Sequence, residues 1–265
     1  METAEQQSAL AKALQSLKSL QDANRVFAIH GSEVLGASNT SVLVENGFLE
    51  PVIRGWYIPS NPSHAGTTIT WYASYWGFIA TYCNDRFGDD WCLTPEESIS
   101  VLSGVSIIPQ QVIVKVLKGS NTPQQLLHET SILNITAKLP SRIDTEPTYG
   151  LHVYPLAEAL LRCSPDFYLN HPTETRACLN ALEDGEELAS IIRDAGGEAY
   201  AGRLLGALKA VGREDAVETI YNVLRDTGRR IEETNPSYGN NCQWPIACDF
   251  AIRFSRVFSS SSSFC

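Results

Sequence analysis

Long apolar runs are absent from this sequence. No stretch approaches the roughly 18 consecutive apolar residues that a membrane-spanning helix needs, while hydrophobic residues make up 43% of the chain, a value typical of globular proteins. The segment Met1–Ala9 is polar and acidic, without the basic and apolar regions of a secretory signal peptide. We therefore expect a cytoplasmic protein that has no membrane partner.

Positive charge is also scarce. The chain has 20 Lys and Arg residues against 30 Asp and Glu residues, which gives a formal net charge of −10. This balance argues against a protein that coats nucleic acid and against a polybasic membrane anchor. Any binding of DNA must therefore be local and helped by symmetry.

The common motifs of nucleotide binding and acyl transfer are missing. The sequence holds no G-x-x-x-x-G-K-[ST] phosphate loop, no G-x-G-x-x-G turn and no G-x-S-x-G nucleophile elbow. His128-Glu129 begins like a zinc-protease motif, but Ile132 stands where the second histidine is needed. We expect no catalytic centre, no cofactor and no metal site.

Cysteines are few and irregularly spaced. The seven lie at positions 83, 92, 163, 178, 242, 248 and 265, and none of the spacings suits a zinc knuckle. An odd number at such spacings favours free thiols over a disulfide framework.

The N-terminal segment has clear helical signals. Residues 3–23 are predicted to form a helix, because Thr3 and Gln6 have the spacing of a capping box and an apolar stripe follows. A short helix beginning at Ser32 is predicted to end at Gly36, and Ser38 is predicted to cap a second helix, residues 39–46, that Gly47 ends.

A hairpin is predicted directly after these helices. Residues 48–52 and 56–59 are apolar, β-prone runs on either side of Arg54-Gly55. Three helices followed by a two-stranded hairpin is the order of elements in a winged helix-turn-helix. A small packing unit of helices and a hairpin could give the same string.

The remaining chain is predicted to be mixed and then helical. Residues 60–66 are rich in turn formers and read as a linker. A long helix over 70–87 carries aromatic side chains that we expect to be core, with a surface for stacking nucleobases as the alternative. Further helices are expected over 95–103, 155–162, 172–182, 186–195, 199–211 and 214–227, and strands over 112–117, 131–136 and 151–154.

The predicted fold class is α+β. A winged helix-turn-helix at residues 1–62 is followed by a mixed, mostly helical domain at 67–235. Residues 236–265 include a run of five serines, lack any periodic apolar pattern and are predicted to be a disordered tail.

One block resembles a known family. The stretch LVENGFLEPVIRGWYIP, residues 43–59, is similar to the winged-helix signature of the antitoxin in abortive-infection type IV toxin–antitoxin systems. The stretch AGRLLGALKAVG, residues 201–212, resembles the C-terminal helix of the same family. The resemblance implies a transcriptional regulator that binds operator DNA and a cognate toxin.

A second resemblance concerns the region found ahead of the catalytic domain in some Fic-family proteins, over residues 1 to about 235. The Fic core motif H-P-F-x-x-G-N begins at His171-Pro172 but continues as Thr-Glu-Thr-Arg, without the glycine turn. Ser41, Glu45 and Asn46 match the short inhibitory pattern [ST]-x-x-x-E-[GN]. The alternative function is thus a non-catalytic remnant or inhibitory partner of a Fic-type AMP transferase.

The candidate DNA-binding residues lie in the second short helix and the hairpin turn: Ser38, Asn39, Thr40, Ser41 and Arg54. The first turn of a recognition helix enters the major groove, and a cation at a hairpin tip suits phosphate. Residues 1–62 hold four basic and six acidic side chains, a net charge of −2, which weakens monomeric binding. The second domain is expected to dimerise or to bind the toxin or a Fic-type protein.

Overall fold

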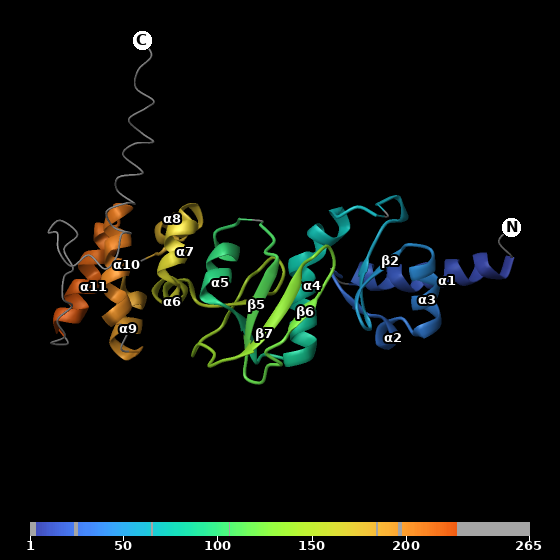
Figure 1. The fold of residues 1–265 in the computed structure, drawn as a ribbon, viewed down its shortest axis with the longest axis horizontal. Helices are drawn as coiled ribbons and strands as arrows, with labels where there is room; N and C mark the ends of the chain where they lie inside the picture. Colours follow the sequence, from blue (N-terminus) through green and yellow to red (C-terminus); the bar gives the residue numbers. More distant parts are fainter. Residues whose placement is uncertain are drawn as a thin grey trace, which may run out of the picture. The chain divides into compact units, whose positions relative to one another are not determined.

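The protein has a mixed α+β fold in a computed structural model that describes residues 4–23, 26–64, 66–105, 107–183, 185–195 and 198–226. The chain divides into two compact units. The first combines the described part of Met1–Leu93 with Ile108–His152, and the second combines Thr94–Ile107 with the described residues from Val153 onward. The α+β class predicted from the sequence is confirmed (Figure 1).

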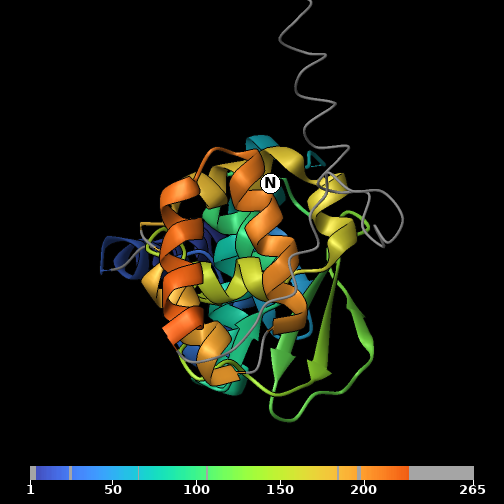
Figure 2. The same ribbon diagram turned by 90° about the vertical axis from the view of Figure 1, so that its left-hand side faces the viewer.

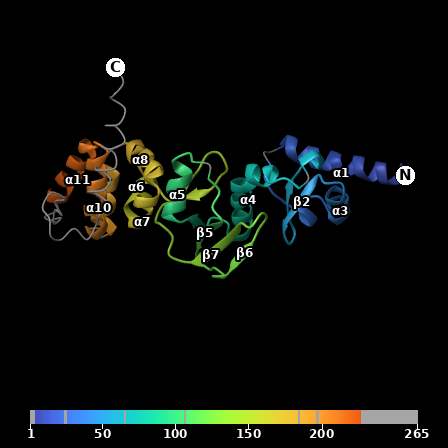
Figure 3. The same cartoon turned by 45° about the horizontal axis from the view of Figure 1, so that its top comes forward.

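The first unit begins with helices and a small antiparallel sheet of three strands. The elements are α1 (Ala4–Ala23), β1 (Ile29–His30), α2 (Gly31–Val34), α3 (Ala37–Glu45), β2 (Leu49–Ile53) and β3 (Trp56–Pro59). The strand order is β1-β3-β2. Figure 3 shows α1, α3 and β2 gathered together, and they share a hydrophobic core of Ala13, Leu17, Ile29, Leu35, Leu43 and Leu49.

The predicted apolar stripe of α1 explains this packing. Ala13 and Leu17 are buried, whereas Lys12 and Lys18 are exposed. Residues four apart share one helix face, so a single face of α1 closes the core beneath α3. Thr3 of the predicted capping box lies outside the described residues.

The rest of the first unit surrounds one long aromatic helix. After the short 3-10 turn Pro62–His64, α4 (Ile69–Phe87) buries Trp71, Tyr75, Phe78 and Tyr82. Their rings contact one another edge-on or stacked, as Phe78 and Tyr82 do with centroids 5.9 Å apart. The prediction that these aromatics are core is therefore confirmed.

A second sheet belongs to the same unit. Its strands are β4 (Trp91–Leu93), β5 (Gln111–Val116), β6 (Pro123–Gln125) and β7 (Ser131–Thr136), in the order β4-β5-β7-β6. The central pair β5–β7 is parallel and the outer pairs are antiparallel. A short ladder of β8 (Asp144–Thr145) and β9 (His152–Val153) follows.

The second unit is helical. It contains α5 (Pro95–Leu102), α6 (Leu156–Arg162), α7 (Pro165–Asn170), α8 (Pro172–Ala181), α9 (Glu186–Ala195), α10 (Glu198–Ala210) and α11 (Glu214–Asp226). The last three helices pack side by side, in orange in Figure 2. Helix α5 comes from far earlier in the chain and packs on α6 and α8.

Hydrogen bonds hold α5 in the second unit. Ser98 is buried, and its hydroxyl accepts from the Tyr154 backbone N–H at 3.1 Å. The Glu96 carboxylate accepts from the Ser164 backbone N–H at 2.8 Å. These contacts across the sequence explain why α5 groups with residues beyond 153.

The predicted elements and the observed ones agree closely in the long periodic segments. The predicted strand over 131–136 and the predicted helix over 186–195 are reproduced residue for residue. The strands β4 and β6 and the helix α7 were not predicted, because three or six residues carry too little periodicity to stand out. The predicted tail, residues 236–265, lies outside the described residues.

The two compact units meet in the sequence after Leu93, Ile107 and His152, and not at the linker predicted over residues 60–66. Trp56 of β3 packs edge-on against Phe78 and Tyr82 of α4, with ring centroids 6.3 and 5.6 Å apart. The hairpin and α4 therefore belong to one unit, and the domain bounds 1–62 and 67–235 stay a prediction. Within the described residues, no helix is both long and apolar enough to cross a membrane.

Candidate nucleic-acid interface

Two glycines delimit α3, the helix that carries most of the candidate DNA-binding residues. Gly36 precedes it with φ +79° and Gly47 follows it with φ +74°, a backbone region that favours glycine. The helix begins at Ala37, with Gly36 as its N-cap. The prediction that Ser38 caps this helix is wrong, because glycine reverses the chain two residues earlier and places Ser38 in the first turn.

The outer face of α3 presents Ser38 and Ser41. Both side chains are exposed, and residues three apart lie on the same helix face. Leu43 is fully buried on the inner side. Hydroxyl groups on an exposed first turn can donate to and accept from base edges or phosphate.

Thr40 lies on the inner face instead. It is 5% exposed, and its hydroxyl oxygen lies 2.9 Å from the carbonyl oxygens of both Gly31 and Gly36. A buried side chain bonded in this way joins α2 to α3 and is not available to DNA. The candidate set thus loses Thr40, because helical geometry turns it away from its neighbours Ser38 and Ser41.

Asn39 is half-buried and already engaged. Its Nδ2 donates to the Leu35 carbonyl at 3.1 Å, back across the turn that precedes α3. Pairing with adenine requires both the amide oxygen and the amide nitrogen of an asparagine. The Leu35 bond uses one of the two Nδ2 hydrogens of Asn39, so the second hydrogen and the amide oxygen remain for a base, with the side chain restrained by Leu35.

Arg54 occupies the tip of the β2–β3 hairpin. Arg54 and Gly55 form the two-residue turn between the paired residues Ile53 and Trp56, and Gly55 has φ +83°. The Gly55 carbonyl accepts from the Gly31 backbone N–H at 3.0 Å, which ties the hairpin turn to the start of α2. Arg54 is exposed and makes no hydrogen bond or ion pair with any residue that the structure describes.

Charge near this face is mixed. Glu45 is exposed at the end of α3, and Glu50 is half-buried on β2. Residues 37–59, which form α3 and the hairpin, thus carry one basic side chain, Arg54, and two acidic ones. Such a surface can bind phosphate locally at Arg54 but gives a weak overall attraction to DNA.

The described cysteines do not form a reactive site. Cys83, Cys92, Cys163 and Cys178 are free thiols, as the sequence predicted, and all four are buried. Burial raises the pKa of the Cys163 thiol to about 12, and that of Cys178 also to about 12. Such thiols stay protonated at neutral pH and are poor nucleophiles. Cys242, Cys248 and Cys265 lie outside the described residues.

The Fic-like pair His171-Pro172 lies at the junction of α7 and α8. Pro172 is the first residue of α8, so a helix follows where the Fic motif requires a glycine turn. The His171 Nδ1 lies 3.2 Å from a Glu174 carboxylate oxygen, and its ring stacks on Phe167 at 4.4 Å. Among the described side chains, no group of three His, Cys, Asp or Glu residues is arranged to hold a metal ion.

A pocket in the first unit was missed by the sequence patterns. It has a volume of about 520 Å³ and is lined by Arg86, Phe87, Asp90, Leu117, Lys118, Ser120 and Asn134. These residues come from three separate segments, so no local motif could reveal the pocket. The one available signal was Asn134, a polar residue at a buried position of the strand SILNIT.

In comparisons with known proteins, no protein-family model, no curated protein and no solved structure matches the chain.

Proposed function

We propose that this protein is a DNA-binding regulator of the antitoxin type, with a winged helix formed by α1, α2, α3 and the β2–β3 hairpin. The order of elements supports the proposal, since a helix pair is followed by a two-stranded hairpin whose second strand pairs with β1. In such domains the second helix of the pair lies in the major groove and its first turn contacts base edges. Here that helix is α3.

The proposal rests on two exposed features of these elements: a polar turn at the start of α3 and an unpaired arginine at the tip of the β2–β3 hairpin. Ser38 and Ser41 face outward, and Arg54 is exposed at the hairpin tip. The bond from Gly31 to the Gly55 carbonyl fixes the hairpin relative to α2. In the proposed complex Ser38 and Ser41 contact bases, Asn39 pairs with adenine through its second amide hydrogen and its amide oxygen, and Arg54 binds a phosphate.

The resemblance of residues 43–59 to the antitoxin family supports the regulatory role. The second unit is proposed to dimerise or to bind a cognate toxin, and no catalytic activity is assigned to the protein. Dimerisation compensates for the weak charge of a single domain, since two half-sites double the number of phosphate contacts.

The test is binding to the promoter DNA of the protein's own gene, followed by fluorescence anisotropy across a salt series that starts at about 50 mM. Arg54→Ala should weaken binding equally on promoter and unrelated DNA. It should also reduce the salt slope by about one unit, because one phosphate contact is lost. Lys138→Ala is the matched control, since Lys138 is also exposed in the first unit and its loss should leave the slope unchanged.

Sequence preference is tested separately. Asn39→Ala should reduce the discrimination between promoter and unrelated DNA by about 1–3 kcal/mol, the value of a bidentate contact with a base. Ser38→Ala combined with Ser41→Ala should act in the same direction. If the wild type binds no promoter DNA at about 50 mM salt, or if Arg54→Ala and Lys138→Ala behave alike, the proposal is refuted.

A further inference from the structure

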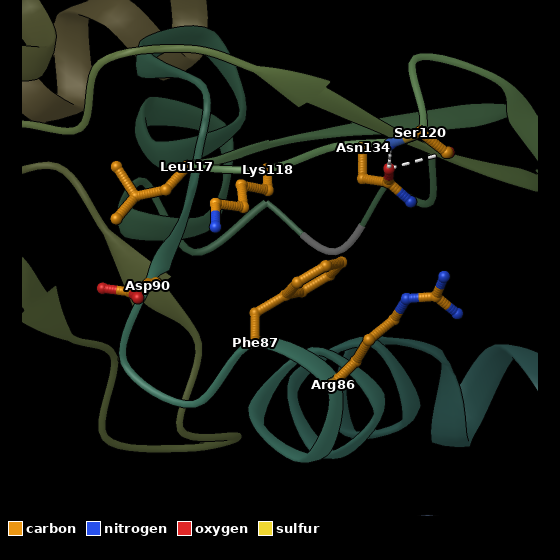
Figure 4. Close-up of a pocket in the computed structure, with 7 residues that line it drawn as sticks. All are labelled: Arg86, Phe87, Asp90, Leu117, Lys118, Ser120 and Asn134. Carbon is orange, nitrogen blue, oxygen red and sulfur yellow. Dashed lines mark hydrogen bonds between the residues drawn. The ribbon is translucent and has the colours of Figure 1, made fainter.

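The pocket of the first unit is built from three segments that meet around the Phe87 ring. The end of α4 and the turn after it supply Arg86, Phe87 and Asp90, the loop after β5 supplies Leu117, Lys118 and Ser120, and β7 supplies Asn134. Figure 4 shows Phe87 in the middle, with Lys118 and Asp90 on one side and Arg86 and Asn134 on the other. Its volume of about 520 Å³ lies in the range of pockets for small organic ligands.

Asn134 is the most informative residue of the pocket, because it is only 3% exposed and yet half satisfied. Its Oδ1 accepts from the Ser120 backbone N–H at 2.6 Å and from the Ser120 hydroxyl at 2.8 Å. These two donors fix which amide atom is oxygen. The Nδ2 group donates to no described residue, and in Figure 4 it turns away from Ser120 toward the side of Arg86.

The Nδ2 atom itself is open to the pocket, so its N–H groups are available to a ligand that accepts from them. Here the bond of Oδ1 to Ser120 holds the amide rigidly, so the Nδ2 donor is preorganised at the edge of the pocket.

Two cations line the same pocket. Arg86 donates from Nη1 to the Tyr82 hydroxyl at 2.9 Å, and its guanidinium lies 5.7 Å from the centre of the Phe87 ring. Lys118 is exposed. Neither has a carboxylate partner within the described part of the chain, although the protein carries a net charge of −10. Two such cations favour an anionic ligand.

We propose that this pocket binds a purine nucleoside phosphate. The phosphate lies against the Arg86 guanidinium and the Asn134 Nδ2 donor, and the base lies on the Phe87 ring. A flat base stacks on an aromatic side chain, and its edge carries donors beside acceptors. In this arrangement Asp90 accepts from the N–H donors of the base and Lys118 donates to a base acceptor. The Asp90 carboxylate thus faces the base and not the phosphate, which makes it compatible with an anionic ligand.

This site is independent of the proposed DNA contacts. None of its residues belongs to α3 or to the β2–β3 hairpin. Its test can therefore fail or succeed whether or not the protein binds DNA.

The experiment is calorimetric titration of the full-length protein with GMP and with AMP, each compared with inorganic phosphate and with the free nucleoside. We expect saturable binding of a nucleotide, with phosphate and nucleoside each at least about 10-fold weaker, because each makes only part of the contacts. Asn134→Asp keeps the acceptor for Ser120 but replaces the free donor by an anionic oxygen. It should weaken nucleotide binding by about 10- to 100-fold.

Two surface variants guard against a folding defect in Asn134→Asp. Lys118→Ala should weaken nucleotide binding by about 10-fold, whereas Lys138→Ala, which removes an exposed lysine that does not line the pocket, should not. The proposal is overturned if neither nucleotide binds saturably at about 1 mM, which corresponds to about −4 kcal/mol. It is also overturned if inorganic phosphate binds as tightly as the nucleotides, or if Lys118→Ala and Lys138→Ala have the same affinity.

Discussion

Glu97 shows how the surroundings of one residue can change its chemistry. It lies in the first turn of α5, where its backbone N–H donates to the Thr94 hydroxyl at 3.3 Å. Burial, together with the neighbouring Glu96 carboxylate, raises the pKa of its carboxyl to about 7. A carboxyl at this position in an exposed helix would instead be stabilised as an anion by the helix dipole.

The raised pKa predicts a pH-dependent stability. Between pH 4.5, the ordinary pKa of the group, and about 7, the folded state binds more protons at Glu97 than the unfolded state does. The free energy of unfolding should therefore fall as pH rises through this window and change no further above it. Glu97→Gln mimics the protonated carboxyl and should remove this fall. Denaturant melts at pH 5, 6, 7 and 8 measure the effect, and parallel curves for wild type and Glu97→Gln would contradict the assignment.

Thr40 shows a residue whose role could not be inferred from its neighbours in sequence. Ser38, Thr40 and Ser41 are all small hydroxyl residues in one helical turn, and from the sequence all three are equally good candidates for contact with DNA. The rotation of about 100° per residue in a helix turns Thr40 inward to the carbonyls of Gly31 and Gly36, while Ser38 and Ser41 face outward.

At the scale of elements, α4 is held close to the segment before β1. A Cβ atom placed on Gly77 would lie 2.1 Å from Cγ and 2.5 Å from Cβ of Phe27. Contacts with the base of a side chain cannot be relieved by rotating its end. Glycine at this point of α4 is therefore required by the close approach of Phe27.

Gly77→Ala should destabilise the first unit despite a better helix propensity. Alanine gains about 1 kcal/mol over glycine in a helix interior, whereas overpacking costs about 1–3 kcal/mol and more when backbone must shift. We expect a net loss in the free energy of unfolding, measured by urea titration. Ala73→Gly, at an exposed site of the same helix, isolates the propensity contribution. A stabilised Gly77→Ala variant would show that Phe27 moves away freely.

At the scale of the whole molecule, the two compact units alternate along the chain. The backbone passes between them after Leu93, after Ile107 and after His152. Helix α5 is thus separated in sequence from the helices it packs against. No composition shift marks these crossings, which is why the sequence suggested a boundary at the turn-rich segment 60–66 instead.

Cutting the chain at that segment should damage the first unit. A fragment of residues 67–226 loses Trp56, which packs on Phe78 and Tyr82 of α4, and leaves these two buried aromatics open to water. We expect this fragment to aggregate, whereas residues 4–226 stay soluble. Gel filtration and circular dichroism of both fragments provide the measurement, and a monomeric 67–226 fragment that keeps its helices and strands would refute the expectation.

The sequence by itself determined the elements whose signals are local. The apolar spacing of Ala13 and Leu17 predicts α1, and the glycines at 36, 47 and 55 mark turns that need positive φ. The strand-like run of residues 131–136 predicts β7. These features depend on neighbours within about one or two turns of chain, so the order of residues is enough to predict them.

Only the tertiary structure decided which distant residues meet. Asn134 on β7 reaches Ser120 in a loop and shares a pocket with Arg86 at the end of α4, and α5 leaves its sequence neighbours to join α6 and α8. Such contacts form because buried apolar faces and buried polar groups must find partners wherever the chain can bring them. The local spacing of residues cannot predict these contacts, because the partners lie far apart in the sequence.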